Sequence, residues 1–157
     1  MKRRDFLKVT GIGAAGAAAL AAPAIAQSMP EIKWRFTTSW PKSLDTLYGA
    51  AELMAKTVGE ITDNKFQLQT FAAGEIVPGL QVLDAVQNGT VEAGHTASYY
   101  YFGKDPTFTF GTSLPFGPNA RLNQGWFLLG GGKDLLNEFY KSYNVTSLLA
   151  ASWFGID

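Results

Sequence analysis

The residues best equipped to bind a small molecule are the four consecutive aromatic side chains Tyr99-Tyr100-Tyr101-Phe102. Three phenols and a phenyl ring in a row cannot all enter a core, whether the segment is helix or loop, so at least one must face solvent or a cleft. A phenol gives a concave site both apolar surface and a hydrogen-bond donor for a carboxylate or carbonyl oxygen. The run therefore indicates a site for such a ligand, with ordinary core and surface packing as the alternative.

Other chemistry-bearing residues are sparse. The chain has no cysteine, which excludes disulfides and thiolate metal sites. It has one histidine, His95, and no second motif beside it from which a Ser/His/Asp arrangement could be argued. We expect His95, which follows a strand, to be a partly buried, hydrogen-bonded histidine, with contact to a ligand as the alternative. The segment Gly130-Gly131-Gly132-Lys133-Asp134 lacks the first glycine and the Ser or Thr of a phosphate loop, so it predicts a break between helices instead.

Near the N-terminus, residues 11–16 read GIGAAG, the letter pattern of a dinucleotide-binding turn. That turn needs a buried strand before it, whereas the preceding residues 1–8 include four basic ones. A small-residue apolar stretch follows, ending in Ala24-Ile25-Ala26. Because Arg3-Arg4-Asp5-Phe6-Leu7-Lys8 resembles the twin-arginine export signal, residues 1–26 are predicted to be a signal peptide that is cleaved after Ala26 and directs the chain to the periplasm.

The 131 residues after Ala26 suffice for a domain with its own core. They carry 9 basic and 12 acidic residues, a net charge of about −3, and no basic patch that would indicate a nucleic-acid partner. No segment among them is long and apolar enough to cross a bilayer, so we expect a soluble mature protein.

The spacing of apolar residues predicts the strands and helices that would position the aromatic run. The sequence predicts strands over 32–38, 66–71 and 91–96, and helices over 44–61, with Ser43 as N-cap, and over 79–88, ended by Gly89 in the left-handed conformation. This alternation implies an α/β fold with a parallel sheet and right-handed crossovers. Ligands bind beyond the carboxyl ends of such strands, at Ser39-Trp40, Ala72 to Glu75 and Ala97 to Gly103.

The second part of the chain is predicted to continue with a strand over 108–113, a turn at Leu114-Pro115-Phe116-Gly117, helices over 119–129 and 134–143, and a strand over 145–151. Trp40 and Phe116, at the predicted ligand end of the sheet, are further candidates for ligand contact.

Three stretches carry a family resemblance: WRFTTSWPKSLDTLYGAAELMAKTV, GLQVLDAVQNGTVEAGHTASYYYFGKDPTFTFGTSLPFGPNAR and GWFLLGGGKDLLNEFY. With the export signal, they make the chain similar to the extracytoplasmic solute-binding subunits of TRAP (tripartite ATP-independent periplasmic) transporters, especially the branch that binds 2-oxo acids such as pyruvate. The resemblance implies a fold like that of type II periplasmic binding proteins. Residues 27–113 would form lobe one, and 114–157 would begin an incomplete lobe two.

The resemblance also implies a non-catalytic carrier that captures a small organic acid and delivers it to a membrane permease. No cofactor is implied, although a sodium or calcium ion can accompany the acid, and some relatives form homodimers. Tyr100 and Tyr101 would contact the acid or its ion, followed by Trp40 and then by Phe116 and Asn119. Arg121, the nearest cation, is a weaker candidate because it begins a helix.

In the family an arginine of lobe two clamps the substrate carboxylate, and it follows the strand that 145–151 matches. This sequence ends at Asp157, before that point, so we expect a fragment of a solute-binding protein. The alternative function is a periplasmic enzyme, specifically an oxidoreductase, because twin-arginine export often serves proteins that fold around redox cofactors.

Overall fold

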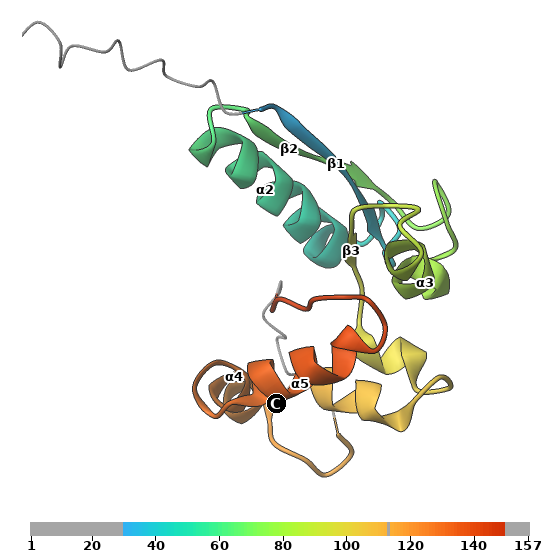
Figure 1. Cartoon of the computed structure of the whole chain (residues 1–157), viewed down its shortest axis with the longest axis vertical. Helices are drawn as coiled ribbons and strands as arrows, with labels where there is room; N and C mark the ends of the chain where they lie inside the picture. The colour runs from blue at the N-terminus through green and yellow to red at the C-terminus, as the bar shows by residue number, and fades with distance from the viewer. Residues whose placement is uncertain (1–29, 113, 150–157) are drawn as a thin grey trace, which may run out of the picture. The chain divides into compact units, whose positions relative to one another are not determined.

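The first part of the described chain forms a three-stranded parallel sheet, with strands in the order β2-β1-β3 (Figure 1). The computed structural model describes residues 30–112 and 114–149; the predicted signal peptide and residues 150–157 lie outside this range. The strands are β1 (Ile32–Thr38), β2 (Phe66–Phe71) and β3 (Ala93–His95). Both pairings are parallel, with Thr37 opposite Phe71 and Thr38 opposite His95, so the carboxyl ends of all three strands meet at one edge. The predicted parallel sheet is confirmed.

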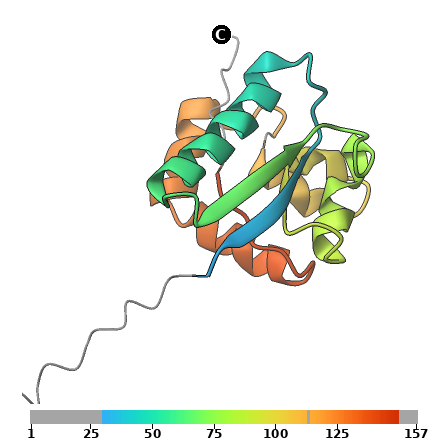
Figure 2. The ribbon, with the colours of Figure 1, turned by 90° about the horizontal axis from the view of Figure 1, so that it is seen from above.

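Helices cover both faces of this sheet (Figures 1 and 2). The chain passes from β1 to β2 in one direction and from β2 to β3 in the other, so right-handed crossovers place the two connecting helices on opposite faces. The first is α2 (Asp45–Ile61), and the second is a single turn, η1 (Gly79–Gln81), continued by α3 (Val82–Gln87). α3 packs so closely on β3 that a Cβ at Gly94 would lie 2.5 Å from Val82 Cγ1.

Boundaries near the first two helices differ in detail from the sequence prediction. Ser43 does not cap α2, because the chain turns through a hydrogen bond from the Leu44 amide to the Pro41 carbonyl, and Leu44 becomes the N-cap without a side-chain bond. Strand β3 is shorter than predicted and begins at Ala93. Gly89 ends the second helix with φ +69°, as predicted.

The strand predicted over 108–113 is wrong for the described residues. Pro106–Gly111 forms a 3-10 helix, η3. Asp105 caps it by accepting a hydrogen bond from the Thr107 amide at 2.7 Å, and Pro106 supplies the fixed φ that suits a helical first turn. The alternation Phe108, Phe110 that imitates a strand places one ring in the core and leaves the other 46% exposed.

The two helices predicted after the turn are confirmed as α4 (Ala120–Leu129) and α5 (Gly132–Lys141), separated by Gly131 at φ +80°. The strand predicted over 145–151 is wrong for 145–149, and its last two residues lie outside the described range. The backbone of Ser147 bonds to the Asn137 side chain, through its amide at 2.6 Å and its carbonyl at 3.1 Å, instead of to a neighbouring strand.

Two clusters of buried side chains form the core. One joins Leu83, Tyr101 and Phe108 with Phe127 of α4 and Leu136 of α5, and the other contains Trp40, Tyr48, Ala72 and Ala97. Residues before and after the predicted lobe boundary at 113/114 therefore share one core cluster, and the boundary itself stays a prediction. Among the described residues, no helix has the length and apolar character needed to span a bilayer.

Candidate ligand-binding site

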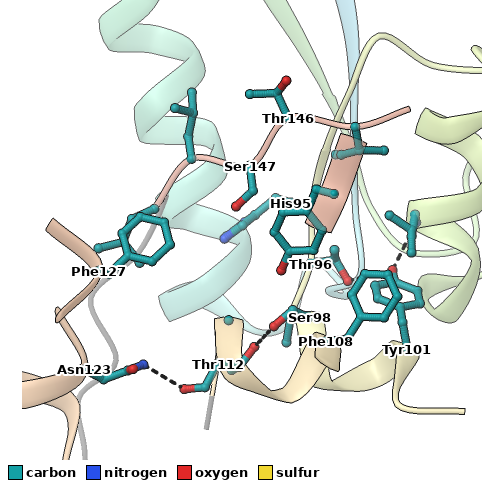
Figure 3. A pocket seen from close by; sticks show the side chains of 18 of the residues that line it. His95, Thr96, Ser98, Tyr101, Phe108, Thr112, Asn123, Phe127, Thr146 and Ser147 are labelled. Carbon is teal, nitrogen blue, oxygen red and sulfur yellow. Dashed lines mark hydrogen bonds between the residues drawn. The ribbon is translucent and has the colours of Figure 1, made fainter. Parts of the chain in front are cut away.

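A cavity of about 350 Å³ opens beyond the carboxyl ends of β1 and β3 (Figure 3). Trp40 follows β1, while His95, Thr96, Ser98 and Tyr101 come from the end of β3 and from the turn η2 (Ser98–Tyr101). The opposite wall is built from 111–112, α4, Tyr140 of α5 and 145–149. The cavity thus occupies the position in which open α/β sheets bind ligands.

Trp40 and His95 form a buried pair on this edge. The indole Nε1–H donates to His95 Nδ1 at 3.0 Å, and the two residues are 6% and 7% exposed. Since an indole can only donate, Nδ1 must be the unprotonated nitrogen, and neutral His95 carries its proton on Nε2. Burial lowers the pKa of His95 and favours this neutral form. The expectation of a buried, hydrogen-bonded histidine is confirmed.

The four side chains of the aromatic run differ in how deeply they are buried. Tyr101 is 3% exposed and belongs to the core, whereas Tyr99 and Phe102 are 37% and 57% exposed and Tyr100 is half-buried. This confirms that the run cannot enter the core as a whole. The Tyr101 hydroxyl accepts a hydrogen bond from the Leu83 amide at 3.1 Å and lies 2.9 Å from Thr96 Oγ1.

Tyr100 packs against Trp40 and Tyr99 and is not among the residues that line the cavity. Its ring centroid is 5.9 Å from that of Trp40 and 4.7 Å from that of Tyr99. Burial, followed by its hydrogen bond with Tyr99, raises the pKa of Tyr100 to about 12, so its phenol keeps its proton at any physiological pH. Of the five candidates from the sequence, Trp40 and Tyr101 line the cavity.

Phe116 and Asn119 are placed differently. Phe116 occupies a turn with φ +60°, its side chain fully exposed. Asn119 is the N-cap of α4, where its Oδ1 accepts from the Leu122 amide at 3.0 Å, and neither residue is among those lining the cavity. Arg121 is exposed in the first turn of the same helix.

Several polar groups of the cavity were not predicted. Ser98 Oγ and Thr112 Oγ1 are hydrogen-bonded, Asn123 Nδ2 donates to the Thr112 carbonyl at 3.3 Å, and Ser147 faces them from the far side (Figure 3). Ser98 falls within the predicted ligand segment 97–103. The other three are brought in from distant parts of the sequence, and no local pattern marks them.

Charged side chains stay out of the cavity wall in the part of the chain that the structure describes. Nearby, Lys42 Nζ lies 2.6 Å from Glu75 Oε1, joining the segments that follow β1 and β2. The hydrogen bond from Lys42, followed by one from the Ala72 amide, lowers the pKa of Glu75. Across 30–112 and 114–149, no group of three His, Cys, Asp or Glu side chains is placed to hold a metal ion.

The sequence matches the family described as bacterial extracellular solute-binding protein, family 7, over residues 36–154. It is also 48% identical, over 97% of its length, to the monocarboxylate 2-oxoacid-binding periplasmic protein of a Nostoc species. The chain spans 43% of that relative's length.

Solved structures share the fold. A TRAP transporter solute-binding protein from Bordetella bronchiseptica, a dimer with calcium and picolinate, is 51% identical with a TM-score of 0.73; the match covers 74% of this chain and 35% of that one. A TRAP periplasmic solute-binding protein from Pseudoalteromonas atlantica with sodium and pyruvate is 34% identical with a TM-score of 0.69, covering 72% of this chain and 34% of that one. The predicted α/β fold class is confirmed. The chain belongs to the family 7 bacterial extracellular solute-binding proteins.

Proposed function

We propose that this chain is part of a periplasmic solute-binding protein that captures a small 2-oxo acid or related carboxylate for a TRAP-type permease. The observation that carries the proposal is the 48% identity, over 97% of the chain, to a protein named for binding 2-oxo acids. Pyruvate in a 34% identical structure and picolinate in a 51% identical one fit the same ligand class, a carboxylate beside a second acceptor atom. The relatives are binding proteins, and no observation favours the oxidoreductase alternative.

The described cavity suits an anionic ligand in two respects. Its wall carries hydrogen-bond donors, among them the Nε2–H of His95, the Asn123 amide and the Ser98 hydroxyl, and the described wall contains no acidic side chain that would repel a carboxylate. The Tyr100 phenol, held protonated, is a further donor beside Trp40. We propose Trp40, in the cavity wall, as a contact for the acid, with Tyr100 beside it as a second and Phe116 and Asn119 as weaker candidates.

The described residues supply no basic side chain to the cavity wall. A buried carboxylate is held best by a bidentate, charge-assisted partner, which is the arginine that the family resemblance places in lobe two. We therefore propose that the cation, and any sodium or calcium ligands, come from residues outside the described range.

Calorimetric titration of the protein expressed from its whole reading frame, with pyruvate, other 2-oxo acids and picolinate, tests the function. We expect saturable binding, and about tenfold weaker binding for Tyr100→Phe, since a hydrogen bond to a charged group is lost. Tyr143→Phe, a half-buried phenol outside the cavity wall, is the matched control. Repeating the titration with calcium and with a chelator tests the accompanying ion. An absence of heat and of any thermal shift with every acid would exclude the proposal.

Export and assembly are separate proposals. We infer from the sequence that Arg3 and Arg4 direct twin-arginine export with cleavage after Ala26, and that the mature protein delivers its ligand to the permease. Changing both arginines to Lys should abolish periplasmic delivery, and undiminished delivery would contradict the twin-arginine route.

Light scattering of the mature protein distinguishes a monomer from the dimer seen in the Bordetella structure.

A further inference from the structure

Three hydroxyls and two backbone groups form a series of hydrogen bonds along the ligand edge of the sheet. The Leu83 amide donates to the Tyr101 hydroxyl at 3.1 Å, and that hydroxyl lies 2.9 Å from Thr96 Oγ1. Thr96 Oγ1 lies 2.6 Å from Ser39 Oγ, which in turn lies 2.6 Å from the Gly79 carbonyl oxygen.

Ser39 is the donor at one end of this series. Its hydroxyl donates towards both the Gly79 carbonyl and Thr96 Oγ1, each 2.6 Å away. Between Thr96 Oγ1 and the Tyr101 hydroxyl either oxygen can donate. The Tyr101 oxygen also accepts the Leu83 N–H, so two bonds within the fold already engage this hydroxyl.

The series ties together pieces that are distant in sequence. Ser39 precedes Trp40 at the end of β1, Thr96 follows β3, and Tyr101 adjoins Tyr100 in η2. At the Gly79 end of the series, the backbones of Gly79 and Ser39 approach each other closely. A Cβ added to Gly79 would lie 2.8 Å from the Ser39 carbonyl oxygen. The two proposed ligand contacts, Trp40 and Tyr100, are thus each one residue from a member of the series.

We propose that Tyr101 and Thr96 are positioning residues, whose hydroxyls hold the Ser39-Trp40 turn and the η2 turn in the arrangement that the ligand meets. This assigns Tyr101 a different role from the direct ligand contact that the sequence suggests. Tyr101 acts through Thr96 and Ser39 rather than by contacting the ligand itself. The inference rests on the proposed function for its binding readout.

Paired substitutions in the protein expressed from its whole reading frame test the proposal. Thr96→Val removes the central hydroxyl at nearly constant shape and should weaken pyruvate binding about fivefold, whereas Thr96→Ser keeps the hydroxyl and should bind like the unmodified protein. Tyr101→Phe should weaken binding to a similar extent. Because the two residues belong to one series, the double variant should lose much less than the two single losses combined.

Ala51→Gly in α2 is the control for destabilisation, since Ala51 is buried outside the series and the change lowers stability without removing a hydroxyl. It should leave pyruvate affinity unchanged. Equal binding by Thr96→Val and the unmodified protein, or failure of Thr96→Ser to restore binding, would overturn the positioning role. If the unmodified protein binds no organic acid, the proposed function fails instead; the coupling of Thr96 and Tyr101, read from the free energy of unfolding in urea, then tests the series itself, and additive losses would overturn it.

Discussion

Trp40 and His95 lie 55 positions apart in the sequence and share one buried hydrogen bond, from the indole Nε1–H to the imidazole Nδ1 at 3.0 Å. The bond fixes the neutral tautomer with its proton on Nε2. It also joins the turn after β1 to the last residue of β3. The packing at the ligand edge of the sheet therefore depends on His95 being neutral.

Acid should weaken the fold through His95. Its pKa is lowered in the folded state from an ordinary value of 6.5, so the unfolded chain binds the proton first. The free energy of unfolding should therefore fall as the pH drops from 7 towards 5, and His95→Asn, whose amide oxygen can still accept from Trp40, should lack this component. Urea unfolding at several pH values measures it. Carboxyls of lowered pKa, such as Glu92, titrate below this window. An unchanged pH slope in His95→Asn would contradict the assignment.

Arg35 and Glu92 should stabilise the β1–β3 pairing at neutral pH. The Glu92 carboxylate accepts from Arg35 Nη2 at 2.6 Å, from Nε at 3.1 Å and from the Arg35 amide at 2.7 Å, and these bonds lower its pKa to about 2. The stabilisation is present above pH 4.5 and is lost as the pH falls towards 2. Glu92→Gln should lower the urea midpoint at pH 7 and flatten that acid dependence.

The control for this ion pair is Glu60→Gln. Glu60 faces Lys56 at 3.8 Å across one turn of α2, with both side chains well exposed. Such pairs contribute little, so the midpoint should not change measurably. Equal effects of the two substitutions would show that the geometry around Arg35 contributes nothing special.

Phe108 should be among the most costly side chains to truncate. It is 1% exposed, and its ring centroid lies 5.0 Å from that of Phe139 and 5.6 Å from that of Tyr101. Phe108→Ala should lower the free energy of unfolding by about 3–5 kcal/mol. Phe110→Ala, in the same 3-10 helix but 46% exposed, should cost under about 1 kcal/mol. If the two variants melt alike, the turn is not packed as described.

A side chain at Gly94 should lower the stability of the fold unless Val82, which packs against it, is made smaller. A Cβ there would lie 2.5 Å from Val82 Cγ1, so Gly94→Ala should destabilise by about 1–3 kcal/mol through overpacking. The double change Gly94→Ala, Val82→Ala should recover part of that loss, which thermal unfolding would reveal. Gly49→Ala, in α2 with nothing within 4 Å of the added carbon, should instead stabilise by about 0.5–1 kcal/mol.

Local patterns predicted the first half of the fold well. The alternation over 32–38 and 66–71 and the helical spacing over 44–61 each describe an element with one buried face, and such an element shows its period in the sequence. The two strands predicted wrongly, at 108–113 and 145–149, fall where two-residue alternation arises without a partner strand. In the first, the Asp105-Pro106 cap outweighs the alternation; in the second, Asn137 takes the backbone bonds.

For the site, the sequence by itself determined the kind of chemistry and its edge of the sheet: an aromatic run, one histidine, no cysteine, and strands whose carboxyl ends coincide. Only the tertiary structure decided which groups are free to act. Hydrogen bonds at Tyr101 and His95 reach partners that are distant in the sequence, and a side-chain atom whose proton or lone pair already bonds within the fold does not offer it to a ligand. No residue type or spacing reveals that, because it depends on which distant group folding brings within 3 Å.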